Sequence, residues 1–215
     1  MTLPVILLGA GGHARVLIDI LRLRAIPLLG VAVPEPSEID RSTHELCVIG
    51  DDEAVCSYSP GAVLLVNGLG AIKITEKRQR IFEYFKCRDY YFTQVIHPSA
   101  VISHDVHLAE GVQIMAGAVI QTGSRVGKNT IVNTRASVDH DCLIGDHVHL
   151  APGVTLSGGV VVGAKTHIGT GAVVIQGIRI GKKATVAAGA VVVSDIADHA
   201  MVGGIPARMM NGDVK

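Results

Sequence analysis

The second half of the chain carries a hydrophobic residue at every sixth position. From Ile96 to Val192 these positions are Ile, Leu or Val, seventeen times without a slip of register. The residue two places earlier is usually small or β-branched, and glycine often follows, where we expect it to supply turn conformations. A period of six fits neither an α-helix nor a simple strand. It is typical of a parallel β-helix, in which three hexads form one coil around an aliphatic interior.

The first half alternates predicted strands and helices. Apolar runs predict strands at 5–8, 28–33 and 62–68, and helical patterns predict helices at 13–23, 51–58 and 75–87, the last capped by Thr75. This alternation indicates a small parallel sheet in an α/β, Rossmann-like domain. All seven aromatic residues lie between Tyr58 and Phe92. We therefore predict two domains, 1–93 and 94–215.

A glycine-rich turn joins the first predicted strand to the first predicted helix. Gly9-Ala10-Gly11-Gly12-His13-Ala14 fits the pattern G-x-G-x-x-[GA], whose backbone approaches a phosphate at a helix N-terminus. The first half has room for only one mononucleotide-binding half, so the pattern favours a phosphate-bearing ligand over NAD. A turn that serves packing alone is the alternative.

Charge and composition exclude several classes of protein. Lys plus Arg and Asp plus Glu both total 19, so the net charge is zero, which argues against a nucleic-acid partner. Mean hydropathy is high at +0.42, yet no run of 18 apolar residues could span a membrane. The start of the chain does not resemble a signal peptide, and the four cysteines show no disulfide or metal spacing. We therefore expect a soluble, cytoplasmic protein without a membrane partner.

His140 and Asp141 are the candidate catalytic residues. Both follow the aliphatic residue Val138, in a turn where strand alternation does not separate them. A carboxylate beside an imidazole orients the ring and stabilises its protonated form, which is how a general base is commonly built. A chance surface pair is the alternative. His149 and His167 are one coil apart at another corner, so they share a site with His140 only if two chains pack side by side.

A zinc site is a second possibility for the histidines. His104 and His140 are separated by two coils, the separation at which γ-class carbonic anhydrases place two zinc-binding histidines. Their third ligand lies five residues further on, where this chain has Gly145. A catalytic zinc needs three protein ligands, and the sequence does not supply them.

Several segments together resemble the bacterial sugar acyltransferases. They are GAGGHARV near the start, LVNGLG at 65–70, VIHPSAVI at 95–102, NTRASVDHDCLIGDHVHLAPG and GGIPAR near the end. The chain is similar over nearly its whole length to the sialic-acid O-acetyltransferases and the nucleotide-aminosugar N-acetyltransferases. This resemblance implies a left-handed β-helix, a homotrimer, and acetyl-CoA in the groove between neighbouring chains.

The resemblance also implies roles for individual residues. His140 is the family's general base, and Asp141 stands where relatives often have Glu. His149 contacts the acetyl-CoA of a neighbouring chain, and the backbones of Thr170 and Ala188 line its pantetheine. The residues that match the family's contacts to the nucleotide sugar are Gly11, Gly12, His13 and Gly68.

The sequence departs from the family after the second predicted strand. Val33-Pro34 stands where relatives often have acidic residues that meet the nucleobase or ribose, so the identity of the nucleotide stays open. Arg208, Lys182 and Lys183 could meet the phosphates of CoA, or they could be solvated surface charges.

The resemblance predicts an acetyl-CoA-dependent N-acetyltransferase acting on a UDP- or GDP-linked 4-amino-4,6-dideoxy sugar. O-acetylation of a sugar such as sialic acid is the nearest alternative. A zinc enzyme of the carbonic anhydrase type and a non-catalytic scaffold are the alternatives from other classes.

Overall fold

The computed structural model describes residues 3–34, 47–71 and 75–210. The chain divides into two compact units, Met1–Pro98 and Ser99–Lys215. Among the described residues, no helix is both long and apolar enough to cross a membrane.

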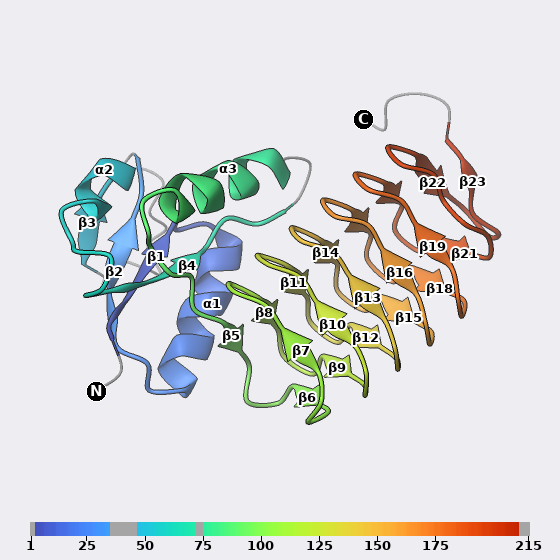
Figure 1. The fold of residues 1–215 in the computed structure, drawn as a ribbon, viewed down its shortest axis with the longest axis horizontal. Coiled ribbons are helices and arrows are strands. Elements are labelled where there is room, and N and C mark those ends of the chain that lie inside the picture. Colours follow the sequence, from blue (N-terminus) through green and yellow to red (C-terminus); the bar gives the residue numbers. More distant parts are fainter. Residues whose placement is uncertain (1–2, 35–46, 72–74, 211–215) are drawn as a thin grey trace. The chain divides into compact units, whose positions relative to one another are not determined.

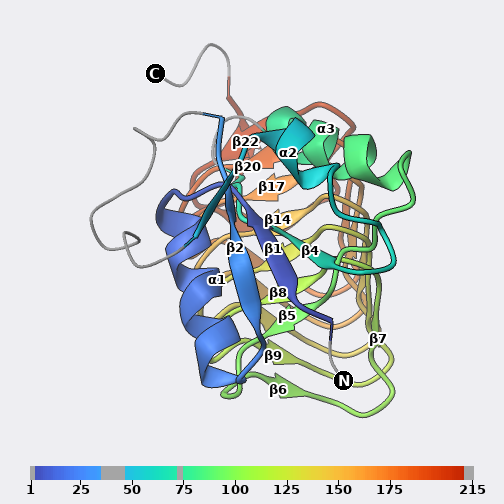
Figure 2. The same ribbon diagram turned by 90° about the vertical axis from the view of Figure 1, so that its left-hand side faces the viewer.

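The N-terminal unit is a small parallel sheet with helices. Its elements are β1 (Val5–Leu8), α1 (Gly12–Leu23), β2 (Leu28–Ala32), β3 (Val48–Gly50), α2 (Asp52–Val55), β4 (Leu64–Asn67), α3 (Thr75–Lys86) and β5 (Val95–Ile96). Four strands pair in parallel in the order β3-β2-β1-β4, and α1 and α3 lie on opposite sides of this sheet (Figures 1 and 2).

The predicted strands and helices of this unit are confirmed, with one addition and one shortening. Strand β3 was not predicted from the sequence. A helix was predicted at 51–58, whereas α2 spans only Asp52–Val55 and is capped by Asp51, whose Oδ1 accepts hydrogen bonds from the backbone N–H groups of Glu53 and Ala54.

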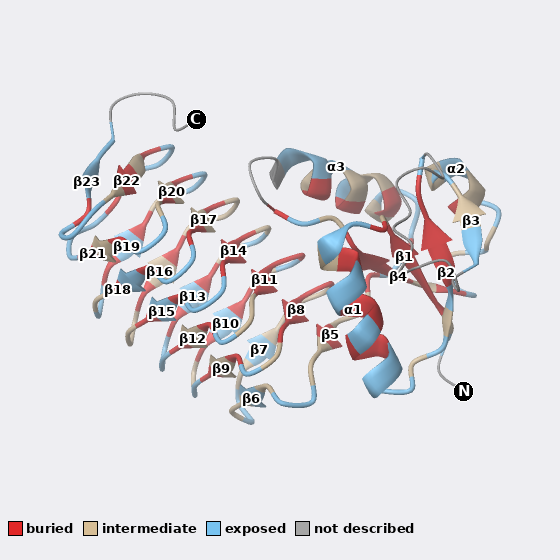
Figure 3. Cartoon of the chain, turned by 180° about the vertical axis from the view of Figure 1, so that it is seen from behind, coloured by how far each residue is buried: buried red, intermediate tan, exposed pale blue. Residues whose placement is uncertain are grey.

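The aromatic residues concentrate in one core between the sheet and α3. Phe82 and Phe85 of α3 pack with Phe92 against Ile6 and Leu8 of β1. The rings of Phe82 and Phe92 are 4.5 Å apart between centroids. Figure 3 shows β1 and β4 as buried elements. This core explains why the aromatic side chains are confined to the first half of the sequence.

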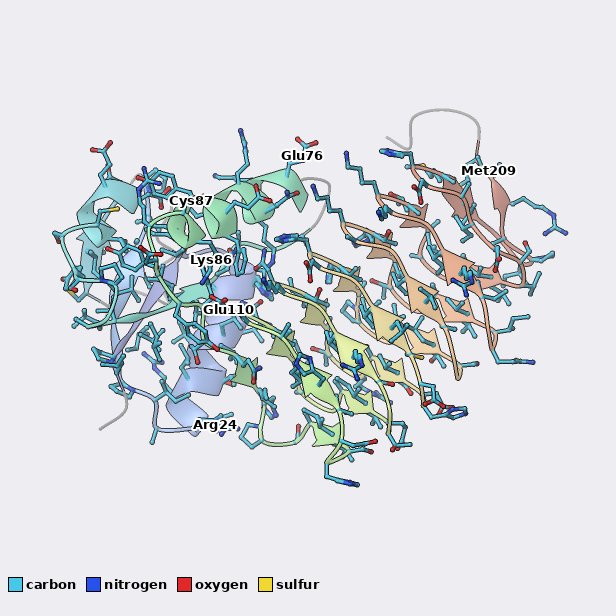
Figure 4. All side chains as sticks on the ribbon, in the orientation of Figure 1. Arg24, Glu76, Lys86, Cys87, Glu110 and Met209 are labelled. Carbon is cyan, nitrogen blue, oxygen red and sulfur yellow. The ribbon has the colours of Figure 1, made fainter. Side chains whose placement is uncertain are left out.

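Helix α3 has charges that match its dipole. Glu76 lies in the first turn and Lys86 in the last (Figure 4), where an acidic and a basic side chain respectively stabilise a helix. The helix begins at Thr75, as predicted. The side chain of Thr75, and with it the predicted cap, lies outside the described residues.

The C-terminal unit is a parallel β-helix, as the hexads predict. Each hexad contributes one two-residue strand, and strands 18 residues apart pair in parallel, as in His149 with His167 and Leu150 with Ile168. Three stacks of strands result (Figure 1).

The strands of the three stacks are as follows. The first stack holds β6 (Val101–Ile102), β9 (Val119–Ile120), β12 (Ser137–Val138), β15 (Thr155–Leu156), β18 (Val173–Val174) and β21 (Val191–Val192). The second holds β7 (His107–Leu108), β10 (Arg125–Val126), β13 (Leu143–Ile144), β16 (Val161–Val162) and β19 (Arg179–Ile180). The third holds β8 (Gln113–Ile114), β11 (Ile131–Val132), β14 (His149–Leu150), β17 (His167–Ile168), β20 (Thr185–Val186), β22 (Met201–Gly203) and the antiparallel β23 (Arg208–Met209).

The aliphatic hexad positions form the interior of the coils. All of them from Ile114 to Val192 are buried. The residues two places earlier, such as Ala136 and Cys142, are also fully buried. A narrow interior therefore selects aliphatic side chains at one position and small ones at the other.

Two different turn positions use glycine, and the expectation that the glycine directly after the aliphatic residue supplies the turn conformation is wrong. The left-handed conformation occurs three residues after the aliphatic position, where glycine or a polar residue stands, for example Gly123, Asn129 and Asp141. The glycine directly after the aliphatic is needed for close stacking instead. A Cβ at Gly145 would lie 2.7 Å from the backbone nitrogen of Ala164 in the next coil.

Candidate active site

His140 and Asp141 lie in the corner turn between β12 and β13. Backbone hydrogen bonds to the adjacent coils hold this turn: Asp141 N–H donates to the Thr122 carbonyl at 3.0 Å, and Gly159 N–H donates to the His140 carbonyl at 2.9 Å. Asp141 occupies the left-handed turn position, with φ of 58°, which Asp tolerates better than most residues. The stacked coils therefore fix the backbone of both residues.

The structure brings the two side chains together. His140 Nδ1 lies 2.9 Å from Asp141 Oδ2, and the side chains are 57% and 70% exposed. Asp139 accepts a hydrogen bond from the backbone N–H of His140 at 2.7 Å. Within the described residues, Nε2 of His140 has no hydrogen-bond partner. An Nε2 without a hydrogen-bond partner, on an exposed ring oriented through Nδ1, can accept a proton from a ligand.

Nearby carboxylates raise the pKa of His140. The hydrogen bond that His140 donates to the carboxylate of Asp141 is the main cause and the negative charge of Asp139 is the second, while desolvation opposes them. Both carboxylates stabilise the imidazolium form, so His140 loses its proton at a higher pH than an isolated histidine.

This pKa shift predicts how Asp141→Asn changes the pH dependence of turnover. A general base must be neutral, so activity rises as pH increases through the pKa of His140. Asparagine removes the stabilising charge, so that pKa falls and the acidic limb of the kcat/KM profile moves to lower pH. A profile measured with and without the substitution checks the direction, and an acidic limb that stays in place would argue against the pairing.

The two histidines on the third stack make contact, as the sequence predicts. The rings of His149 and His167 are 4.9 Å apart between centroids. His149 is only 4% exposed and its Nε2 lies 3.1 Å from Asn133 Nδ2. His167 Nδ1 is buried without a hydrogen-bond partner in the described structure, and burial lowers the pKa of His167. Because His149 lies within β14, it stands apart from the corner that carries His140.

Thr170 and Ala188 stack at a further corner. They are exposed, and Gly189 N–H donates to the Thr170 carbonyl at 2.8 Å. This corner follows the third stack, whereas His140 follows the first. Lys182 and Lys183 lie at the remaining corner, between β19 and β20. These lysines are therefore at neither the corner of His140 nor the corner of Thr170 and Ala188.

The glycine-rich turn of the N-terminal unit ends at the start of α1. Gly11 is the N-cap residue, no side chain caps the helix, and no acidic residue lies in its first turn. Such a helix start favours an anion. Gly9 has φ of +95°, which requires glycine, but Gly11 has φ of −73°. Gly11 therefore needs no unusual backbone conformation.

Gly68 is held beside this turn by close backbone contacts. A Cβ at Gly68 would lie 2.7 Å from the Leu8 carbonyl oxygen and 3.1 Å from the Ala14 Cβ. The buried Arg78 of α3 donates to the carbonyls of Asn67 and Leu69 at 2.8 and 2.6 Å, and burial lowers its pKa to about 9. Arg78 thus holds both neighbours of Gly68 by hydrogen bonds, a role that was not predicted from the sequence.

These contacts predict that Gly68→Ala destabilises the protein. The added methyl group has no space between β1 and α1, and overpacking of this kind costs about 1–3 kcal/mol. Gly70→Ala is the matched control, because its Cβ would meet only the His13 Cβ at an ordinary 3.6 Å. Urea unfolding of both variants measures the difference, and equal stability of the two would contradict the expected crowding.

A cavity of about 310 Å³ opens at the carboxyl ends of the parallel strands. Gly9 follows β1, Ala32 ends β2, and Leu69 follows β4, and all three line it. In open parallel sheets, ligands bind outside the carboxyl ends of the strands. Gly11, Gly12, His13 and Gly68 do not line this cavity themselves, although Gly9 and Leu69 flank them.

The charged walls of the cavity were not predicted from the sequence. Lys77 and Arg80 of α3 line one side and Asp52 of α2 another. Burial raises the pKa of Asp52, an effect that Asp51 reinforces and Lys77 opposes. Lys77, Arg80 and Tyr84 share one face of α3, at the spacing of successive helical turns. That spacing could have indicated that the three side chains share one face of the helix. The sequence alone did not show that this face lines a cavity.

The histidines that the structure describes do not assemble a metal site. Among residues 3–34, 47–71 and 75–210, no three His, Cys, Asp or Glu side chains gather closely enough to hold a metal ion. His104 and His140 do share a corner, two coils apart, but no third ligand joins them in the part of the chain that the structure describes.

Comparisons with known proteins agree with this geometry. The family described as bacterial transferase hexapeptide (six repeats) matches residues 123–158, which include His140 and Asp141. Perosamine N-acetyltransferase from Caulobacter crescentus, solved with CoA and GDP-perosamine, is 36% identical, covers 97% of each chain and superposes with a TM-score of 0.90. The chain belongs to the hexapeptide-repeat sugar acetyltransferases.

Other members of the sugar acetyltransferases are also similar. The acetyltransferase domain of PglB from Neisseria gonorrhoeae, solved with acetyl coenzyme A, is 33% identical over 98% of this chain and 100% of that one, with a TM-score of 0.89. GDP-perosamine N-acetyltransferase from Escherichia coli O157:H7 is 34% identical over 92 residues, which is 43% of this chain and 42% of that protein. The C. crescentus protein has also been solved with one histidine replaced by asparagine or by alanine.

Proposed function

We propose that the protein is an N-acetyltransferase that transfers the acetyl group of acetyl-CoA to the amino group of a nucleotide-linked 4-amino-4,6-dideoxy sugar. The observation that carries this proposal is the His140–Asp141 pair, 2.9 Å apart, in a chain similar along 97% of its length to perosamine N-acetyltransferase. GDP is favoured over UDP as the nucleotide, because the similar proteins from C. crescentus and E. coli are named for GDP-perosamine.

The chemistry follows from the exposed Nε2 of His140. The sugar amine attacks the thioester carbonyl of acetyl-CoA, and Nε2 takes the proton that the nitrogen loses as the tetrahedral intermediate forms. The C–S bond then breaks, and the thiolate of CoA leaves and takes up the proton that the imidazolium of His140 gives back. Asp141 holds the ring in place and stabilises the imidazolium, and general-base catalysis of this kind contributes about 10²–10⁴-fold. No residue needs to be acylated.

The N-terminal unit supplies a nucleotide site in this proposal. A Rossmann-like domain over residues 1–93 binds the nucleotide sugar, and its diphosphate lies near Gly11, Gly12, His13 and Gly68. The uncapped start of α1 favours the negative charge. The adjacent cavity, with the cationic Lys77 and Arg80 at its wall, accommodates the rest of the nucleotide. Relatives often have acidic residues at the positions of Val33 and Pro34, where they meet the nucleobase or ribose. In this protein the cavity recognises the nucleotide instead.

Residues 94–215, a left-handed β-helix in this proposal, perform the transfer as a homotrimer. His140 lies at one corner, and the proposed acetyl-CoA contacts Thr170 and Ala188 lie at another. One acetyl-CoA reaches both corners when two chains pack side by side. His149 is assigned to the same cofactor of a neighbouring chain. Acetyl-CoA and nucleotide sugars are intracellular substrates and the four cysteines are free thiols, which supports a cytoplasmic location.

The trimer is tested by sedimentation at several protein concentrations. We expect a trimer that is retained at the concentrations used in activity assays. A stable monomer with full activity would contradict the shared site.

The activity is tested by thiol release from acetyl-CoA across a panel of acceptors. The panel contains 4-amino-4,6-dideoxy sugars linked to GDP, UDP and dTDP, the free amino sugars, and free sialic acid. We expect the GDP-linked amino sugar to give the highest kcat/KM. Release with sialic acid alone would favour the O-acetyltransferase, and no release with any acceptor would contradict the proposal.

A further inference from the structure

The corner that carries His140 is built from two rows of stacked residues. Residues 18 apart occupy equivalent places in successive coils, as the pairing of Ser137 with Thr155 and of Val138 with Leu156 just before this corner shows. One row reads His104, Thr122, His140, Gly158 and Gln176, and the next reads Asp105, Gly123, Asp141, Gly159 and Gly177.

The ring of His140 occupies the space that a side chain at Gly158 would need. A Cβ at Gly158 would lie 2.5 Å from both Cε1 and Nε2 of His140 and 3.1 Å from its Cδ2. Gly158 does not have a left-handed φ, so its backbone conformation does not require glycine. Asp141 is accommodated in the same way on the other side, because a Cβ at Gly123 would clash with its Oδ1. The pair therefore fits between two positions without side chains.

The same corner contains a second His-Asp sequence that does not form a pair. His104 and Asp105 lie two coils before His140 and Asp141, in the same two rows. Above His104 stands Thr122 instead of a glycine. Asp105 Oδ2 accepts hydrogen bonds from Thr122 Oγ1 at 2.7 Å and from Gly123 N–H at 3.0 Å, and within the described residues it makes none with His104. The residues of the next coil thus hold the carboxylate of Asp105, whereas the carboxylate of Asp141 meets the imidazole of His140.

We propose that Gly158 is a positioning residue for the transfer reaction: because it lacks a side chain, the ring of His140 lies over it and keeps its hydrogen bond to Asp141. This inference rests on the proposed role of His140 as general base. A methyl group at 158 displaces the ring, and a threonine there also offers the carboxylate of Asp141 a competing hydroxyl, as Thr122 does for Asp105.

The test compares Gly158→Ala and Gly158→Thr with Gln176→Ala, which changes the same row one coil further on. Both substitutions at 158 are expected to lower kcat at least about tenfold, since misplacing a catalytic group by about 1 Å can cost 10²-fold. Gln176→Ala should keep the turnover of the unsubstituted protein. The midpoint of thermal unfolding should stay the same in all three variants. In the two variants at 158, the atoms nearest the new Cβ belong to the exposed, movable ring of His140.

NMR titration of His140 gives a readout that a purely structural role would not move. In Gly158→Ala the hydrogen bond to Asp141 is lost, so the pKa of His140 falls toward its ordinary value, with the resonance assigned by its absence in His140→Ala. An unchanged His140 pKa in Gly158→Ala would overturn the proposal, whether or not the variant is less stable. This measurement needs no turnover. If the protein released no thiol with any acceptor, the proposed function would fail. The NMR-measured pKa of His140 would still show whether Gly158 positions the ring.

Discussion

His140→Ala is expected to lower turnover at least about a hundredfold while the protein stays folded. The loss corresponds to the lower part of the range for general-base catalysis. The fold should be unaffected, because the side chain is 57% exposed and its hydrogen-bond partner Asp141 is exposed as well. The KM for acetyl-CoA should stay within about twofold, since the base acts in the transition state and not in cofactor binding. Steady-state kinetics with both substrates measures these effects.

His104→Ala is the matched control for this experiment. It removes a histidine from the same row of the same corner, two coils away, where the following aspartate bonds to Thr122 instead. We expect it to keep the turnover of the unsubstituted protein. Equal losses in the two variants would show that the corner matters only for folding or assembly, and full activity of His140→Ala would remove the general-base assignment.

Gly11→Val is expected to raise the KM for the nucleotide sugar at least about tenfold, which corresponds to about 1.4 kcal/mol. No heavy atom lies within 4 Å of a Cβ at Gly11, and its φ of −73° and ψ of −173° suit any residue. The free protein should therefore accept valine without strain. The cost arises only when a diphosphate approaches the start of α1, which the branched side chain obstructs. The KM for acetyl-CoA should change by less than about twofold.

Gly61→Val controls for the effect of a branched side chain at an exposed glycine. A Cβ at Gly61 also meets nothing within 4 Å, and the φ of Gly61 is not left-handed. Gly61 precedes β4 and therefore lies toward the amino ends of the strands, whereas the cavity lies at their carboxyl ends. This variant should bind both substrates normally. If Gly11→Val weakened acetyl-CoA as much as the sugar, the division of labour between the two units would be wrong. If it changed neither KM, the turn would serve packing only.

The β-helix was predictable because its structure repeats with the sequence. Each coil places the same three strands and three turns around the same narrow interior, so the aliphatic positions recur every six residues. The His140–Asp141 contact followed from the same periodicity, since both residues fall in one turn. The stacking of His149 on His167 followed from their separation by one coil. In these cases local spacing determines spatial proximity.

The unpredicted features depend on contacts between segments that no period relates. Strand β3 has only three residues at the edge of its sheet, too few to show alternation. The cavity walls combine Asp52 with Lys77 and Arg80, and only the folded sheet brings α2 and α3 to one opening. Glycine itself is ambiguous, because it permits a left-handed φ at Gly123, close stacking at Gly145 or room for a neighbouring ring at Gly158. The sequence does not distinguish these three uses.

The most direct test of the proposed activity is identification of the product. The protein is incubated with acetyl-CoA and a GDP-linked 4-amino-4,6-dideoxy sugar, and the sugar product is analysed by mass spectrometry and NMR while free thiol is counted. The account predicts one acetyl group in amide linkage at the amino nitrogen, with one CoA thiol released for each acetylated sugar. An ester on a sugar hydroxyl, or thiol release without acetylated sugar, would contradict it.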